Sequence, residues 1–312
     1  MEIRWSKDYE MGIEGFDRDH KQLFAIAGKL LDKVRDPSDI KDPNLRLFVL
    51  REGIRYLWGY FDDHALREEA YMREIGYADY GLHKRLHDEF KENTLGRYQR
   101  LLETGACSQE EVMDFVGRGI GWLVEHISTA DLAIVGRGTI GKPRITKINS
   151  QVVEQEFNTI FASALNVNVG ARLIDPNYAG TPFGSAICQE LIYQRGDRKV
   201  SVLAGLENSL LAAAAEAVYG PELQGMEALI MATLEIFSAN FWRTVGSRFI
   251  EGDAEMVFKE NHFLTQSQIQ ERYAKHMPKL SVLFDSNRGK FFVATETDIA
   301  AQAESFDLSV GA

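Results

Sequence analysis

Apolar residues recur at intervals of three and four along the first 135 or so residues, which is the spacing of one face of an amphipathic helix. Leu23, Ile26 and Leu30 show this spacing most clearly. Stretches rich in proline, glycine and charged residues interrupt the pattern. The pattern predicts helices at about residues 18–35, 45–75, 82–102 and from 109 onward.

The start of the last of these helices carries its own signal. Ser108 precedes the apolar run, and Glu111 follows three residues later. This order is typical of a capping box, in which each side chain accepts a hydrogen bond from the backbone N–H of the other residue. Four helices with short connections indicate an all-α, up-down four-helix bundle.

The pattern changes after residue 135. The stretch GRGTIGKPRITKINS, residues 136–150, has three glycines, one proline, four basic residues and no apolar periodicity. A linker is the interpretation that this composition favours. We therefore expect one domain over residues 1–135 and a second over residues 151–312.

Short apolar runs separated by turn signals fill the second domain. A helical pattern at 152–165 comes first, and SAICQELIYQ and KVSVLAG then flank RGDR in the manner of a hairpin. Helical stretches follow at about 209–219 and 224–245. The strand-like runs MVFKE, LSVLF and KFFVATE come last, the final two as a hairpin around DSNRG. This order predicts an α+β domain.

Composition and charge narrow the class of partner. The 312 residues are 45% hydrophobic and 26% charged, with a formal net charge of −11, which argues against nucleic acid or an anionic membrane as a partner. Cys107 and Cys188 form no CxxC motif or disulfide framework, which suits a reducing compartment. The start of the chain lacks a secretory signal pattern, and no apolar run is long enough for a bilayer. A cytoplasmic location is expected.

Histidine placement supplies the candidate chemistry. Of the seven histidines, five fall in the predicted bundle. His64 and Glu68 are four residues apart on the second helix, and His83 and His87 are four apart on the third. Each pair therefore projects from one face of its helix, with about 6 Å between the side chains.

The first and fourth helices add His20, His126 and Asp131, so that every helix offers a metal-ligating side chain. Side chains on facing helices are the usual source of metal sites in bundles. Asp131 lies five residues after His126, a step of about 140° around an ideal helix, so a π-type widening or the helix end has to bring it round. His64 with Glu68 alone reads as a surface ion pair, but the coincidence of all these residues in one bundle favours a metal site.

These residues give the first domain a resemblance to bacterial hemerythrins. The resembling elements are Trp5, GIEGFDRDH at 12–20, HALREEAYM at 64–72, HKRLH at 83–87 and WLVEHISTAD at 122–131. The resemblance implies a non-haem di-iron site with O2 as its ligand, in which Glu68 and Asp131 bridge the irons. The implied metal ligands are His20, His64, Glu68, His83, His87, His126 and Asp131.

Donor arithmetic indicates one open coordination position. Two octahedral irons offer about 12 positions, of which five imidazoles, two bridging carboxylates and a shared oxo or hydroxo group fill all but roughly one. No Glu-x-x-His pair of the oxygen-activating di-iron proteins is present, so O2 binding is expected rather than oxygen activation. Trp122 and Phe115 are expected either to pack in the core or to line the O2 pocket, and Glu69 is expected to be a solvated surface acid.

The second domain has a weaker resemblance, in the order of its elements, to the CheX-type chemotaxis phosphatase domain. That family uses a Glu-x-x-Asn pair, but here Ser238 stands three residues after Glu235, and the nearest asparagine is Asn240. Two interpretations stay open. Either Glu235 and Asn240 retain phosphatase activity toward a phosphorylated response regulator, or the domain serves homodimerisation or partner binding.

The function expected from these observations is an oxygen or redox sensor. Its di-iron centre would bind O2, and its C-terminal domain would signal to a response regulator or another signalling protein. The alternatives are an O2-gated response-regulator phosphatase, a di-iron peroxide or nitric oxide reductase, and simple O2 storage or delivery.

Overall fold

The computed structural model of the chain describes residue 3 and residues 5–35, 38–140, 149–165, 167–221, 223–249 and 256–296. The chain divides into two compact units. The first consists of Met1–Gly141 with Val218–Phe237, and the second of Lys142–Ala217 with Ser238–Ala312. Most of the expected linker, residues 141–148, lies outside the described residues.

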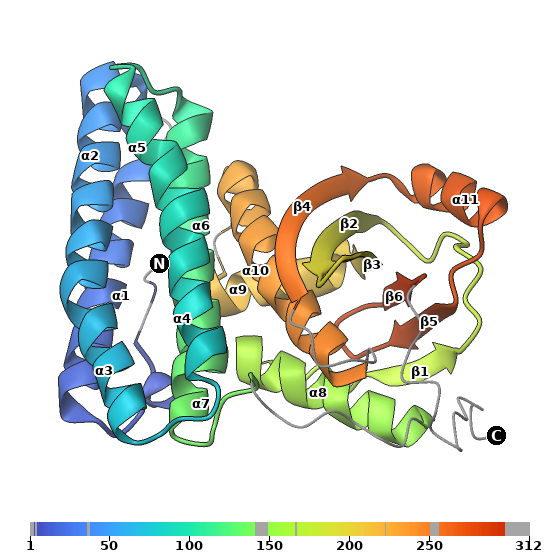
Figure 1. The fold of residues 1–312 in the computed structure, drawn as a ribbon. Helices are drawn as coiled ribbons and strands as arrows, with labels where there is room; N and C mark the ends of the chain where they lie inside the picture. The colour runs from blue at the N-terminus through green and yellow to red at the C-terminus, as the bar shows by residue number, and fades with distance from the viewer. Residues whose placement is uncertain are drawn as a thin grey trace. The chain divides into compact units, whose positions relative to one another are not determined.

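Four helical runs form the bundle of the first unit. The first run is α1 (Glu14–Arg35), and the second joins α2 (Pro43–Tyr60), the π-helical turn η3 (Phe61–Ala65) and α3 (Leu66–Glu74). The third joins α4 (Tyr80–Glu89), the π turn η4 (Phe90–Leu95) and α5 (Gly96–Glu103). The fourth joins α6 (Gln109–His126), the π turn η5 (Ile127–Asp131) and α7 (Leu132–Ile134). Figure 1 shows these runs side by side, and contacts link α1 with α2 and α6, α2 with α5 and α6, and α3 with α4.

Local signals define where the helices begin. The Ser108 hydroxyl accepts the backbone N–H of Glu111 at 3.1 Å, and the Glu111 carboxylate accepts that of Ser108 at 2.7 Å, so the predicted capping box is confirmed. Asp42 caps α2 by accepting the N–H of Asn44 at 2.9 Å, with Pro43 at the first helical position. Short 3₁₀ turns at Lys7–Tyr9 and Asp39–Lys41 precede α1 and α2.

The second unit contains an antiparallel sheet of six strands in the order β1-β5-β6-β3-β2-β4. The strands are β1 (Arg172–Asp175), β2 (Ala186–Arg195), β3 (Arg198–Glu207), β4 (Met256–Leu264), β5 (Leu280–Asp285) and β6 (Phe291–Thr295). The helices are α8 (Ser150–Leu165), α9 (Asn208–Tyr219), α10 (Glu227–Phe249) and α11 (Gln266–Lys275), of which α9 and α10 contribute residues to both units.

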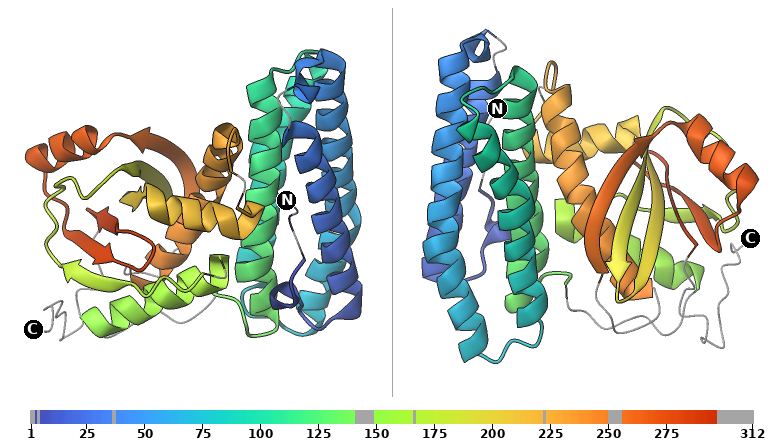
Figure 2. Two further views of the ribbon diagram at one scale, coloured as in Figure 1. Left: turned by 180° about the vertical axis from the view of Figure 1, so that it is seen from behind. Right: turned by 45° about the horizontal axis from the view of Figure 1, so that its top comes forward.

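Both predicted hairpins are present. β2 pairs with β3 across a two-residue loop that opens with Gly196, whose φ of 57° suits the turns that such loops need. β5 pairs with β6 around DSNRG. The register of β2 against β4 shifts between Ile192 and Tyr193, a bulge of the kind that bends a strand, and Figure 2 shows the strands as strongly curved.

The architecture agrees with the fold class expected from the sequence, an all-α bundle followed by an α+β domain with an antiparallel sheet. The sequence reading missed β1 and α11. α11 begins with a capping box of Thr265 and Gln268, and its Ile269 and Tyr273 pack into the core beside Cys188 of β2. Of the helices within the described ranges, none is long and apolar enough to span a membrane.

Close packing around a glycine of the sheet leads to a stability prediction. A Cβ atom on Gly205 of β3 would lie 2.4 Å from the Phe292 ring and 3.0 Å from the Cys188 sulfur. We expect Gly205→Ala to lower the free energy of unfolding of the second unit by about 1–3 kcal/mol, because overpacking forces its neighbours to shift. Urea unfolding followed by circular dichroism measures this. Gly28→Ala, whose Cβ meets nothing within 4 Å, is the control, and equal stability of Gly205→Ala and wild type would contradict the packing.

Candidate metal centre

Seven metal-ligating side chains meet in the interior of the bundle. None is more than 2% exposed, and each helical run supplies at least one. They are His20 of α1, His64 of η3, Glu68 of α3, His83 and His87 of α4, His126 of α6 and Asp131 of η5. These are the seven residues that the sequence analysis named.

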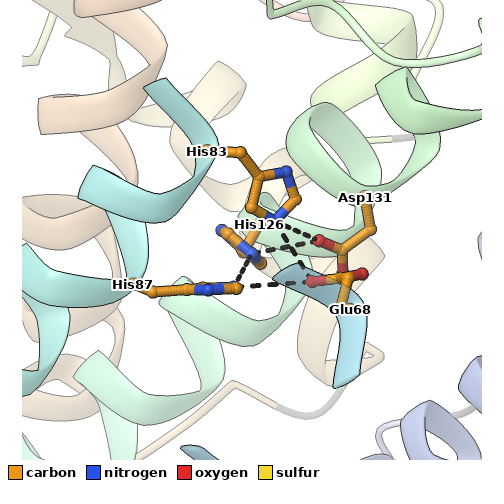
Figure 3. Close-up of side chains that lie close together, drawn as sticks. All are labelled: Glu68, His83, His87, His126 and Asp131. Atoms are coloured by element: carbon orange, nitrogen blue, oxygen red, sulfur yellow. Dashed lines mark hydrogen bonds and ion pairs between the residues drawn. The ribbon is translucent and has the colours of Figure 1, made fainter. Parts of the chain in front are cut away.

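The seven side chains form two groups that share Glu68. The first group is Glu68, His83, His87, His126 and Asp131, and the second is His20, His64 and Glu68; within each group the ligand atoms lie within 4.8 Å of one another. Figure 3 shows the first group with its imidazoles and carboxylates pointing toward a common centre. We call these the three-imidazole side and the two-imidazole side.

Asp131 lies between the two sides. Its Oδ1 is 3.0 Å from His126 Nε2 and 3.3 Å from His83 Nε2, while its Oδ2 is 3.3 Å from His20 Nε2. Glu68 Oε2 lies 3.2 Å from His83 Nε2. Asp131 thus contacts histidines of both sides, and Glu68 belongs to both groups of ligand atoms.

The π turn η5 explains how Asp131 reaches this position. The spacing of His126 and Asp131 required a widened turn, and the backbone over Ile127–Asp131 is π-helical. A second π turn, η3, holds His64, and a third, η4, starts three residues after His87. All three departures from α-helix thus occur beside residues of the site, where π turns are often found.

Burial and the neighbouring charges together set the protonation of the site. Burial raises the pKa of Asp131, but attraction to His126 and contacts from His126 and His83 outweigh it and hold that pKa well below its usual range. Burial lowers the pKa of His126 to about 4, so its imidazole is neutral at pH 7 and keeps the lone pair that a metal needs. Burial also lowers the pKa of His83, but the charges of Glu68 and Asp131 raise it to about 10. The carboxylates are ionised and require positive charge beside them.

Several buried donor atoms of the site lack a hydrogen-bond partner within the described ranges and are available to coordinate a cation. His20 Nδ1, His64 Nε2 and Glu68 Oε1 are buried and have no hydrogen-bond partner among the residues that the structure describes. A buried polar atom without a partner costs about 1–3 kcal/mol. Imidazole nitrogens with carboxylate oxygens are a donor set for first-row transition metals, so the residues present fit a pair of such ions.

Comparison with known proteins agrees with this geometry. Residues 11–136 match the family of hemerythrin HHE cation binding domains. These residues form a hemerythrin-type domain. Its relatives include the bacteriohemerythrin of Clostridium acetobutylicum, 27% identical over 128 residues, which are 41% of this chain and 94% of that protein. The myohemerythrin of Sipunculus nudus is 28% identical over 136 residues, covering 43% of this chain and 91% of that protein.

A solved structure resembles the other half of the chain. It is the chemotaxis protein CheX from Desulfovibrio desulfuricans, with a TM-score of 0.28 and 12% identity, covering 48% of this chain and 98% of that one. Nothing about activity or partners follows from this likeness.

Two carboxylates that the sequence analysis did not assign to the site contact the Nδ1 atoms of two of its histidines. Asp19 Oδ2 lies 3.0 Å from His64 Nδ1, and Glu69 Oε1 lies 3.3 Å from His87 Nδ1. The expectation that Glu69 is a solvated surface acid is wrong, because it is only 6% exposed. Glu69 follows Glu68 by about 100° around the helix, which suggested solvent, but α4 packs over that face and places His87 there.

Aromatic residues enclose the hemerythrin-type site. Trp122 stacks on His126, with 4.5 Å between ring centroids, and on Phe90 at 4.4 Å. A cavity of about 40 Å³, mostly apolar, lies among α1, α2 and α6, and Trp122 and Phe115 both line it. Both residues are also fully packed, at 2% and 1% exposed, so the core interpretation holds for each.

The residues considered for phosphatase chemistry have other partners. The Glu235 carboxylate accepts a hydrogen bond from Arg118 Nη2 at 2.5 Å within the first unit. The Ser238 hydroxyl is buried and donates to Gln189 Oε1 at 2.9 Å. Asn240 is five residues from Glu235 on α10, a step that puts the two side chains on different faces of a regular helix. Their catalytic role stays a prediction.

Proposed function

We propose that the hemerythrin-type domain holds two non-haem iron ions and binds O2 at them. His83, His87 and His126 would hold the iron on the three-imidazole side, His20 and His64 would hold the other, and Glu68 and Asp131 would serve both. The observation that carries the proposal is the pair of buried donor groups sharing Glu68, with one oxygen of Asp131 near each. The match to a cation-binding family that includes bacteriohemerythrin and myohemerythrin supports it.

When bound, a pair of irons supplies the electrons for reversible O2 binding. The chain's own residues set the conditions for it. The two-imidazole side has fewer protein donors, so it has room for a small ligand. Tyr60 stacks on His64 with 4.5 Å between the ring centroids, and Phe16 meets the same imidazole edge-on at 5.4 Å. These rings exclude water from that side, which protects a redox centre from side reactions.

The apolar cavity beside Trp122 and Phe115 gives O2 a place within the bundle. Its volume of about 40 Å³ exceeds the roughly 10–15 Å³ that a single water requires. Its mostly apolar lining suits a small apolar molecule such as O2. Trp122 connects the cavity to the site, because its ring stacks on His126.

The proposal extends to sensing, because the segment that leaves the bundle is hydrogen-bonded to the turn that carries Asp131. We call residues 137–140 the exit segment. The Thr129 carbonyl, inside η5, accepts the N–H groups of Thr139 at 3.0 Å and Ile140 at 3.3 Å. Thr129 is two residues from Asp131, so a shift of the π turn moves the acceptor of both bonds.

Packing holds the exit segment closely against η5. A Cβ atom on Gly138 would lie 2.2 Å from the Thr129 carbonyl oxygen and 2.4 Å from the Ala133 nitrogen, so only glycine fits there. The Arg137 guanidinium donates to the carbonyls of Glu10 at 2.5 Å and Asp8 at 3.1 Å, which ties the segment to the start of the chain.

A simple O2 store has no need of such an attachment, whereas a sensor needs a part that responds to the site. In this proposal a change in the state of the site would move Asp131, the movement would reach Thr129 through η5, and the hydrogen-bonded exit segment would respond. The proposal also includes a signalling partner, homodimerisation through the C-terminal domain and a cytoplasmic location. These three parts come from the sequence analysis.

Iron analysis of histidine variants tests the di-iron site. We expect His64→Ala to lose the iron of the two-imidazole side, and with it the visible bands that appear on adding O2 to the reduced protein. His262→Ala is the matched control, because His262 is half exposed, pairs with Glu260 and lies in β4. Metal analysis with one absorbance spectrum of each purified protein gives the answer. Wild-type iron content in a folded His64→Ala protein would contradict the ligand assignment.

Amide exchange of the exit segment tests the sensing step. We expect the Thr139 and Ile140 amides to exchange at least about tenfold faster after iron is removed with a chelator, because a loosened η5 no longer holds Thr129 in place. Gly138→Ala should exchange fast even with iron bound, and Gly28→Ala should behave as wild type. Equal exchange with and without iron would rule out the exit segment as the responding part and favour storage.

A further inference from the structure

A chain of charged groups leads from the two-imidazole side to the surface. His64 Nδ1 and Arg67 Nη2 both contact the same oxygen, Asp19 Oδ2, at 3.0 Å and 2.5 Å. Arg67 also donates to both oxygens of Asp63, at 3.2 Å and 3.1 Å. The exposed fraction rises along the chain, from 3% for the side chain of His64 to 17% for Asp19, 42% for Arg67 and 74% for Asp63.

The contact fixes the tautomer of His64. With Asp19 ionised, Nδ1 carries the proton and donates it to the carboxylate, so Nε2 is left with its lone pair. His64 Nε2 is the buried atom that has no hydrogen-bond partner among the described residues, and it belongs to the two-imidazole side. Asp19 therefore turns the correct nitrogen toward that side.

The three-imidazole side has a similar arrangement, but its cation lies farther from the carboxylate. Glu69 contacts His87 Nδ1 at 3.3 Å, but the Lys84 amine is 4.0 Å from Glu69 and donates to both oxygens of Asp88 at 2.8 Å. At the two-imidazole side the guanidinium shares the very oxygen that faces the imidazole. The two sides thus differ in how far a cation weakens the carboxylate behind the histidine.

This difference has an electronic consequence. A carboxylate on the outer N–H of a ligating imidazole raises its basicity, and a more basic ligand stabilises the more positive oxidation state of a metal. A guanidinium on the same carboxylate oxygen draws charge away and opposes this effect.

We propose that Asp19 is a positioning residue for His64 and that Arg67 regulates its strength, so that the pair sets the reduction potential of the two-imidazole side. The inference rests on the proposed di-iron function and adds a way for the surface of the protein to adjust it. A partner or an anion that engages Arg67 would change the potential without touching the metal.

Three single substitutions in the iron-loaded full chain test this, with the reduction potential followed through the visible absorbance of the ferric form. Asp19→Asn should raise the potential and lower iron affinity by about 10–100-fold. Arg67→Gln should lower the potential, since Asp19 then acts on His64 unopposed. Asp63→Asn is the matched control, because it removes a carboxylate from the same arginine but not from the histidine.

High salt separates the inference from a general effect of surface charge. At about 1 M salt the screening length falls to about 3 Å, so an effect of the exposed Asp63 should vanish while that of the hydrogen-bonded Asp19 persists. In proton NMR of the reduced protein, the His64 Nδ1–H signal should shift in Asp19→Asn, which a change in stability alone would not produce.

Each outcome bears on one proposal or the other. Shifts of opposite sign for Asp19→Asn and Arg67→Gln, with Asp63→Asn unchanged at high salt, support the inference. Equal shifts for Asp19→Asn and Asp63→Asn, or shifts of the same sign for Asp19→Asn and Arg67→Gln, overturn it while leaving the di-iron site in place. If Asp19→Asn loses its iron, the sign for Arg67→Gln decides. A wild-type chain that takes up no iron overturns the proposed function itself.

Discussion

Two ionised carboxylates are buried at the centre of the helical bundle, and the first unit has to surround them with positive charge and hydrogen-bond donors. Glu68 and Asp131 are 0% exposed and ionised, and a charge in such a place is tolerated only with opposite charge and donors around it. Every helical run contributes to meeting that need, because five imidazoles approach the two carboxylates from different sides. The rings of Phe61, Phe90 and Trp122 then close the space around them.

The helices depart from regular geometry to reach this arrangement. A π turn gives up good backbone hydrogen bonds, and its compensation here is the position of a side chain in the site. The turn η5 has a second consequence, because the Thr129 carbonyl inside it becomes the acceptor for the exit segment. One local distortion thus places Asp131 and also attaches the chain that leads away from the bundle.

Much of the fold and of the site follows from local signals. Helical periodicity, the Ser108 capping box and the RGDR and DSNRG turns were sufficient for four helical runs and two hairpins. They were insufficient for β1, which is four residues long and pairs with β5 more than a hundred residues later. Glu69 was misread for the same reason, since its neighbour His87 comes from another helix.

The sequence by itself determined which seven residues can bind metal and that Asp131 needs a widened turn, because spacing along one helix decides which face a side chain occupies. Only the tertiary structure decided the division into a two-imidazole and a three-imidazole side, the carboxylate behind each, and the bond from η5 to the exit segment. Most of these contacts are between residues of different helices. The distances between them depend on how the helices pack, and a local sequence pattern carries no information about that packing.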